Sequence, residues 1–563
     1  MPRSAGWDGP KGPEGARTLD RRRFLKGAVV GLGALALTGP EAAAATHHRL
    51  HAHPKRKRIV PEVYQRPLPG GLSAPSARWL VEENAKPGTT NWVVTGIQTP
   101  HALEGYASQV SAVAGDDVIL FVNTASPAFH VEAYRMGYYQ GLAGRLIFQS
   151  DTVARQQQQF PTLAPDTNMV SANWEPSLTL SIDHTWPPGN YLLKLVGTAG
   201  QQQYIPLTIR NDASLAAFVI QNSVTTWQAY NLWGDYSLYY GAAPRGKDFA
   251  HRSRIVSFDR PYPQTWAQGA ADFFGNEFPL LYEMERLGLD LTYTTDVDLH
   301  AQPQLLANHR VLFSLGHDEY WSTEMRSGAQ SALASGTNLA FLGANACYRQ
   351  IRFQPSAVGP NRQEICYKDA SEDPLARQDP MLTTVNWIQA PLNDPESSLI
   401  GSMYQSVGAN GDLTVADASS WLWNNSGLSD GEQLLGVVQG EYDRYVPSLP
   451  NPAGVDVLAH SPVPGQNNWS DITYYTVPVG GGVLASGMAS FVFKLSNTTE
   501  FPTNIVPTAI PGVTEILLQA MHNVFGTFGN GPAGTLQASG GNWPNFYRGS
   551  AAAVGTAAGT TSA

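Results

Sequence analysis

Side chains that could do acid–base or metal chemistry follow an apolar run in the middle of the chain. Residues 311–315 are short enough for a buried strand, and Gly316 breaks the run. Four reactive residue types come next, namely His317, Asp318, Glu319 and Tyr320. A histidine beside carboxylates could act as a general base or support other active groups, although the pair His317 and Asp318 could equally cap a turn.

The elements around these residues predict where they lie in the fold. Residues 322–324 can start a helix that residues 325–334 continue, and residues 338–342 form a second apolar run that Gly343 ends. Three further polar or reactive residues follow it, namely Asn345, Cys347 and Tyr348. This order is a β-turn-α-β unit, and ligands bind at the carboxyl ends of the strands in open α/β sheets.

Other polar side chains also lie at or near the ends of apolar runs. They are Tyr230, Asn231, Glu441, Asp443 and His460. If these strand ends converge, they would form a crevice rich in oxygen ligands and acid–base groups, with Tyr230, Asn231, Asn345 and His460 lining the substrate pocket. Taken singly, a tyrosine at a strand end is ordinarily a packing residue, and a histidine there is ordinarily a hydrogen-bonded one. The prediction depends on the recurrence of such residues.

The chain has two cysteines, Cys347 and Cys366. Residues 351–353 and 365–367 could pair as a hairpin, which would bring the sulfur atoms together, so we predict a disulfide for an exported chain. Cys347 also lies where a nucleophile elbow could place a reactive thiol, although the G-x-C-x-G pattern is absent.

The flanking pattern predicts a chain of several domains. Residues 93–210 contain short alternating strands separated by turns, which favours an antiparallel β-sandwich. Strands then alternate with helices, which indicates a mostly parallel sheet covered on both faces, and a last helix spans about 514–525. Beyond Gly529 the composition predicts disorder. The expected domains are a signal peptide (1–46), a basic linker (47–90), a sandwich (91–212), an α/β domain (213–528) and a low-complexity tail (529–563).

The N-terminal segment predicts export. Arg21, Arg22 and Arg23 form a twin-arginine motif before an apolar run too short to span a bilayer, and no other segment could span one. The protein would then be secreted or held in the cell envelope. The histidine-rich segment 47–58 reads as a solvated linker or as a metal-scavenging tail. The net charge of −10 argues against nucleic acid as a partner.

Seven segments resemble one known family. They are HVEAYRMGYYQGLAGR (130–145), TTWQAYNLWGDYS (225–237), VSFDRPY (256–262), GHDEYWS (316–322), FLGANACYRQIRF (341–353), GEYDR (440–444) and LAHSP (458–462). In this order they are similar to the C-terminal domain of the large (β) subunit of N,N-dimethylformamidase. The resemblance covers roughly residues 90–525.

The resemblance implies a fold and a metal centre. The fold would be a glutamine-amidotransferase-like α/β domain with a β-rich companion. The metal would be one ferric iron (Fe3+) held by Tyr320, Tyr348 and Glu441, with Tyr230 as a rival for one ligand position. Ferric iron suits phenolate ligands, whereas zinc more often recruits His or Cys. One position departs from the family pattern, because Gln439 stands where the amidase has a catalytic histidine.

Two functions therefore compete. The first is an exported, iron-dependent hydrolase of linear amides, with His317, Asp318, Glu319 or Asp443 as the base or as supporting groups. The second is a non-catalytic cell-envelope protein, without metal, that uses the same crevice to bind a ligand such as a glycan. Either protein could be a homo-oligomer, and the amidase would take a small amide substrate.

Overall fold

The computed structural model describes residues 62–96, 99–243, 246–496 and 510–547. The predicted signal peptide and most of the basic linker lie outside these residues. The chain divides at Pro61, and only the unit that begins at Glu62 is described below. No helix in the described ranges is long and apolar enough to cross a membrane.

The first part of this unit is built from two sheets. One sheet has the order β11-β5-β3, and the other has the order β4-β13-β12-β6-β7 with β8 beside β6. Apolar side chains from both sheets share one core, as in a sandwich, and among these pairings only β4 with β13 is parallel. The strands are β3 (Leu103–Ala107), β4 (Ser111–Val113), β5 (Asp117–Thr124), β6 (Ala128–Met136), β7 (Gly144–Gln149), β8 (Val153–Ala154), β11 (Leu178–Ser181), β12 (Gly189–Gly197) and β13 (Gln202–Arg210).

The second part is organised by a seven-stranded sheet with the order β18-β14-β19-β21-β28-β27-β26. The first five strands are parallel, and β27 and β26 are antiparallel additions at one edge. The mostly parallel sheet is thus observed. Its strands are β14 (Phe218–Asn222), β18 (Leu291–Thr295), β19 (Val311–Leu315), β21 (Asn338–Leu342), β26 (Asp456–Val463), β27 (Asn468–Thr476) and β28 (Gly482–Ala485).

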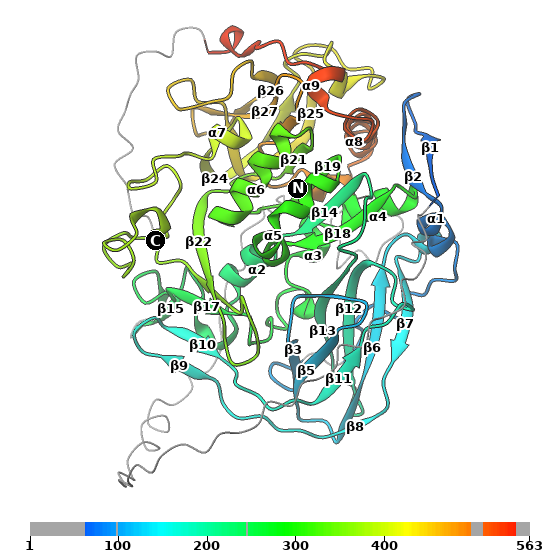
Figure 1. The fold of residues 1–563 in the computed structure, drawn as a ribbon, viewed down its shortest axis with the longest axis vertical. Coiled ribbons are helices and arrows are strands. Elements are labelled where there is room, and N and C mark those ends of the chain that lie inside the picture. Colours follow the sequence, from blue (N-terminus) through cyan, green and yellow to red (C-terminus); the bar gives the residue numbers. More distant parts are fainter. Residues whose placement is uncertain (1–61, 97–98, 244–245, 497–509, 548–563) are drawn as a thin grey trace, which may run out of the picture. The chain divides into compact units, whose positions relative to one another are not determined.

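Helices cover both faces of this sheet (Figure 1). Neighbouring residues of a strand point to opposite faces, and so Phe313 packs in one apolar cluster with α4 (Phe278–Arg286) and α8 (Val513–Phe528). Leu312 packs in the other cluster with α5 (Asp296–Ala301) and α6 (Thr323–Ala334). Because both faces are covered, the central strands β19 and β21 are mainly apolar along their length rather than alternating.

Two glycines let the central strand ends approach each other. Gly316 has a φ of +67°, and a Cβ there would lie 2.5 Å from the Cβ of Asn276. A Cβ at Gly343 would lie 1.3 Å from the carbonyl oxygen of Gly316. Only glycine fits both positions, so the loops after β19 and β21 lie directly against each other.

One short strand was not predicted, and one predicted strand end belongs to a different sheet. A short strand, β20 (Tyr320–Ser322), precedes α6 and pairs in parallel with β22 (Arg349–Gln354). Glu441 does not follow a strand of the main sheet, because β25 (Gln433–Arg444) forms a bulged two-stranded hairpin with β24 (Met403–Thr414). β25 continues past Glu441, since β24 supplies pairing partners for Tyr442, Asp443 and Arg444.

The predicted C-terminal disorder is wrong for residues up to 547. The chain after α8 forms α9 (Ala533–Leu536), and the ring of Trp543 lies 4.9 Å from that of Tyr445. The Tyr547 hydroxyl donates a hydrogen bond to Asp471, and the Tyr547 side chain is buried. Aromatic anchors therefore hold a segment whose small-residue composition suggested disorder.

Candidate active site

Five side chains form a polar group that we call the tyrosine–carboxylate cluster: Tyr230, Tyr239, His317, Glu319 and Glu441. Glu319 lies at its centre. The Tyr239 hydroxyl lies 2.7 and 2.8 Å from the two Glu319 carboxylate oxygens, and the Tyr230 hydroxyl lies 2.9 Å from Oε2. The two hydroxyls are 2.9 Å apart.

His317 joins the two carboxylates of the cluster. Its Nδ1 lies 2.6 Å from Glu441 Oε2, and its Nε2 lies 3.2 Å from Glu319 Oε2 and 3.1 Å from the Tyr230 hydroxyl. Burial alone would lower the pKa of His317, but the charges of Glu441 and Glu319 raise it well above its usual value. The imidazole is thus held in its charged form by the two acids.

Two basic side chains flank the cluster, and burial together with the charge of Arg349 lowers the pKa of Lys368 well below its usual value. Arg349 Nε donates to Glu319 Oε1 at 2.8 Å. Lys368 Nζ donates to the Tyr320 hydroxyl at 2.8 Å and lies 3.2 Å from the centroid of the Tyr239 ring. Burial raises the pKa of Glu319, yet its contacts with His317 and Arg349 outweigh this and lower it. Glu319 is therefore an ionised carboxylate in a buried position.

Segments far apart in the sequence deliver these side chains. Tyr230 ends α2 (Val224–Tyr230), and Tyr239 lies in the loop that follows. The turn after β19 places His317 and Glu319, and β25 brings Glu441 across. The side chain of Glu319 is 1% exposed, whereas those of His317 and Glu441 are each 13% exposed. The cluster thus has a sealed floor and a rim that solvent reaches.

The three residues that resemblance predicts as iron ligands have different partners. Tyr320 accepts a hydrogen bond from Lys368, and Tyr348 accepts one from Asn386 at 2.7 Å. Glu441 pairs with His317. This ligand set stays a prediction, because no contact of the described residues joins its members.

Three other predicted residues lie beside or beneath the cluster. Asp318 is fully buried and accepts hydrogen bonds from Ser314 Oγ at 2.6 Å and Gln221 Nε2 at 2.8 Å, so it supports the strand ends. The backbone N–H of Asn345 donates to Asp443 Oδ1 at 2.9 Å. Burial raises the pKa of Asp443 to about 7.

Two predicted pocket residues have structural contacts elsewhere. The buried Asn231 donates to the Pro261 carbonyl at 3.0 Å, and its own side-chain oxygen accepts from the Trp233 N–H. His460 pairs with Asp471 at 2.7 Å and stacks on Trp469. His460 lies within β26, the outer antiparallel strand, rather than after a parallel strand, so its position does not follow the strand-end rule.

The predicted disulfide is not formed. Cys347 and Cys366 are both buried free thiols, and they belong to different apolar clusters. The hairpin itself is correct, since Arg352 pairs with Ile365, but the cysteines lie outside its paired residues. Burial raises the pKa of Cys347 to about 12, which disfavours the thiolate that a nucleophile needs.

Sequence reasoning missed three residues at the site: Tyr239, Arg349 and Lys368. Tyr239 lies just beyond the family-like segment 225–237. Arg349 adjoins the predicted ligand Tyr348. Lys368 has no sequence signal, because it reaches the cluster from the turn after β23 (Gln363–Ile365).

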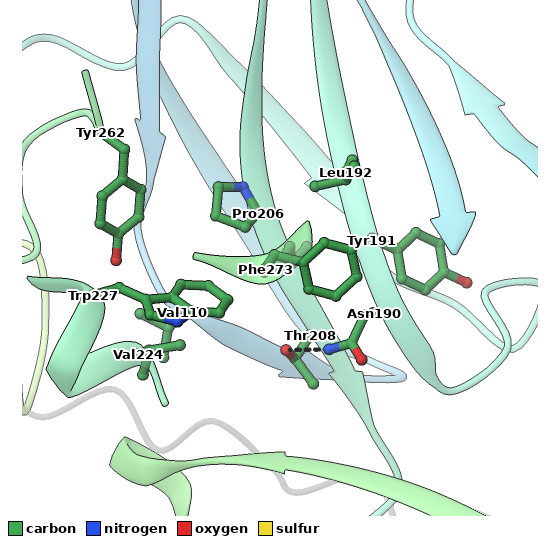
Figure 2. Close-up of a pocket in the computed structure, with 11 residues that line it drawn as sticks. Val110, Asn190, Tyr191, Leu192, Pro206, Thr208, Val224, Trp227, Tyr262 and Phe273 are labelled. Carbon is green, nitrogen blue, oxygen red and sulfur yellow. Dashed lines mark hydrogen bonds between the residues drawn. The ribbon is translucent and has the colours of Figure 1, made fainter. Parts of the chain in front are cut away.

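A separate cavity lies where α2 meets the sandwich (Figure 2). Trp227, Tyr262 and Phe273 are among its lining residues. Asn190 donates a hydrogen bond to Thr208 in its wall. Since α2 provides Trp227 here and Tyr230 to the cluster, this helix links the two places, and the cavity has no member of the cluster in its lining.

Comparison with known proteins decides the family. The model of the family "N,N-dimethylformamidase beta subunit-like, C-terminal" matches residues 130–502, more than half of the chain. The chain belongs to this family. Its relation to dimethylformamidase makes a hydrolase the coarse assignment. No curated protein matches the chain.

Solved structures add no argument about the fold. Murine CEACAM1b is 14% identical over 21% of this chain and 62% of its own, with a TM-score of 0.11. A cycloisomaltooligosaccharide glucanotransferase from Paenibacillus sp., complexed with cycloisomaltoheptaose, is 9% identical over 76% of this chain and 81% of its own. Its TM-score is 0.17, which is too low to relate the two folds.

Proposed function

We propose that the chain is a metal-dependent hydrolase of C–N amide-type bonds, with the tyrosine–carboxylate cluster as its reaction centre. Membership of a family related to dimethylformamidase supports the reaction class. The observation that carries the proposal is the ionised, buried Glu319 beneath phenol and imidazole groups that solvent reaches. An oxygen-rich centre with a sealed floor and an open rim suits a small polar substrate. Export through the twin-arginine route is part of this proposal.

Arg349 and Lys368 provide a place for the substrate carbonyl. Amide hydrolysis builds negative charge on the carbonyl oxygen, and positive charge and hydrogen-bond donors in a site with little water stabilise that charge. Arg349, which contacts Glu319, supplies the positive charge, and Lys368, held over the Tyr239 ring, supplies a donor. We assign them to the carbonyl side of the substrate.

A proton must reach the leaving nitrogen, because an amine leaves far more easily than an amide anion. Asp443 suits this role, since its pKa of about 7 allows it to exchange a proton near neutral pH. Its Oδ1 accepts from the Asn345 N–H, which leaves Oδ2 to hold the proton. Gln439 cannot donate a proton to the leaving nitrogen. We therefore assign to Asp443, which also lies in β25, the role of the histidine expected at position 439.

The donor chemistry of the site fits the hard cation that the family implies. Among the described residues no group of three His, Cys, Asp or Glu side chains could hold a metal, so a cation here needs phenolate ligands. Two sets of two tyrosines and one glutamate are available: the carried-over set of Tyr320, Tyr348 and Glu441, and the set within the cluster. A bound ferric ion would polarise the carbonyl and acidify a water molecule.

The test is release of amine from a panel of small linear amides by the full chain. We expect turnover by the wild type and a drop of about 10- to 100-fold for Glu441→Gln, because Glu441 orients His317. Glu432→Gln is the matched control, since Glu432 is exposed next to the start of β25. Turnover of no amide in the panel, or turnover unaffected by Glu441→Gln, would count against the proposal and favour the ligand-binding alternative.

A further inference from the structure

We infer that the cavity between α2 and the sandwich binds a small alkylammonium ion, with an N–H group of the ion on Asn190 Oδ1 and its alkyl groups against Trp227 and Tyr262. All three residues line the cavity, which is separate from the tyrosine–carboxylate cluster. The inference goes beyond the proposed function, because binding can be measured without any turnover. An amine is also the product that amide hydrolysis would release.

One buried oxygen atom in the cavity wall has no partner. The Asn190 side chain is 4% exposed, and its Nδ2 donates to Thr208 Oγ1 at 3.2 Å and to Asn222 Oδ1. These two contacts fix which end of the amide is the oxygen. Asn190 Oδ1 accepts no hydrogen bond from any residue that the structure describes. A buried acceptor left unpaired is unfavourable, so this oxygen suits a donor that a ligand supplies.

A chain of amide groups makes Asn190 Oδ1 a strong acceptor. Asn190 Nδ2 donates to Asn222 Oδ1, and Asn222 Nδ2 donates to the buried carboxyl group of Glu277. Hydrogen bonds in such a chain polarise one another, so charge on Glu277 increases the negative charge on Asn190 Oδ1. A donor in the cavity is thus connected to a carboxyl group that it does not touch.

Aromatic rings provide the other part of the wall. The rings of Trp227 and Tyr262 have centroids 6.3 Å apart and planes at 75°, so they form a corner. In the view of Figure 2 this corner lies on one side and Asn190 on the other. The faces of aromatic rings attract cations, most strongly where little water competes. None of the described lining residues carries a positive charge that would oppose such a ligand.

Two buried acids act on the ring at the edge of the cavity. Burial raises the pKa of Tyr262, and the charges of Glu364 and Glu277 raise it further, whereas Arg260 and Arg362 oppose them. Glu364 is fully buried, and neither of its carboxyl oxygens has a hydrogen-bond partner within the described ranges. Burial raises the pKa of both acids, and a cation nearby would favour their charged forms. The surroundings therefore favour a cation over an anion.

The lining also selects the kind of cation. A hard inorganic ion needs several oxygen ligands, whereas this cavity offers one buried unpartnered oxygen among apolar side chains such as Val110 and Val224. A quaternary ammonium ion has no N–H group for Asn190. A secondary ammonium ion has both an N–H donor and alkyl groups, and it therefore fits the oxygen and the rings together.

The experiment is calorimetric titration of the full chain with dimethylammonium chloride at constant ionic strength. Two matched ligands are compared: propan-2-ol, which has a similar shape but no charge, and tetramethylammonium, which has the charge but no N–H group. We expect saturable binding of dimethylammonium at one site. Its affinity should be at least about tenfold higher than that of either matched ligand, because hydrogen bonds from charged donors are the stronger ones.

Variants test whether the ion lies in this cavity. Asn190→Leu removes the acceptor and Tyr262→Leu removes a partly exposed ring, and each should weaken dimethylammonium binding about tenfold or more. Glu441→Gln, in the tyrosine–carboxylate cluster, and Trp469→Leu, at an exposed tryptophan, are the controls and should bind as the wild type does. Unfolding curves identify any variant that does not fold, and Tyr262→Leu decides the case if Asn190→Leu is such a variant.

The inference is overturned if dimethylammonium does not bind, if either matched ligand binds as tightly, or if folded Asn190→Leu and Tyr262→Leu keep the wild-type affinity. Binding that is lost in Glu441→Gln but kept in Tyr262→Leu would place the ion in the tyrosine–carboxylate cluster, which also overturns it. Amide turnover without dimethylammonium binding would remove this inference alone. Binding by a protein that turns over no amide would remove the proposed function alone.

Discussion

Two clusters in this protein use nearly the same residue types for different ends. In the first, Arg135 bridges both oxygens of Glu285 at 2.7 and 3.1 Å and donates to the hydroxyls of Tyr139 and Tyr293. In the tyrosine–carboxylate cluster, Glu319 likewise lies among two tyrosines and an arginine. The Arg135 network joins the sandwich to α4 and β18, and the side chains of Arg135 and Glu285 are fully buried.

The difference lies in access and in how the carboxylate is used. Glu285 faces an arginine fork that satisfies both oxygens, so it has no capacity for a ligand. Glu319 shares its oxygens with two hydroxyls and His317, and its neighbours reach solvent. Residue type alone therefore does not distinguish the two clusters, whereas the partly open rim and the histidine between two acids do.

The largest effect on stability is expected at the sealed network. Glu285→Ala leaves the buried Arg135 charge without its partner, and such a loss costs about 3–5 kcal/mol of unfolding free energy. Chemical denaturation of the wild type and the variant measures this. A loss below about 1 kcal/mol would show that solvent enters the network and would remove the contrast with the open cluster.

A buried carboxyl that lacks a bidentate arginine partner should respond to pH. Glu396 is 1% exposed, and burial raises its pKa to about 8, while Arg326 lowers it less. Its neutral form therefore gives stability that is complete below its ordinary pKa near 4.5 and is lost as the pH rises toward 8. Glu396→Gln cannot ionise, so relative to wild type it should be more stable at pH 9 than at pH 5. Urea denaturation at both pH values measures this difference, and an equal difference at the two would contradict it.

The smallest change in stability is expected at the rim of the open cluster. Lys368→Met removes a half-buried amine that contacts Tyr320 and Tyr239 and whose pKa burial and Arg349 hold well below its usual value, so unfolding free energy should change by about 1 kcal/mol or less. Amide turnover should nevertheless fall about tenfold or more, because the carbonyl side loses a hydrogen-bond donor. Lys247→Met, at an exposed ion pair with Asp235, is the control. Equal turnover in both variants would place Lys368 outside the reaction.

Sequence predicts the central elements well and the assembly of the site only in part. The strands 311–315 and 338–342 were predicted to the residue, because continuous apolar runs bounded by glycine leave few alternatives. Glu441 was named as a candidate, but the β24–β25 hairpin that positions it depends on pairing between distant residues, which local pattern does not encode. Tyr239 and Lys368 reach the cluster from loops, where tertiary contacts rather than periodicity decide the position.

The most direct measurement is amide turnover by Glu319→Gln, made together with its unfolding curve. The variant keeps the size of the side chain but removes the charge at the centre of the cluster. The account predicts that turnover falls by at least about 100-fold, and that the loss of stability is smaller than in Glu285→Ala. Wild-type turnover in a folded Glu319→Gln protein would contradict the claim that this cluster is the reaction centre.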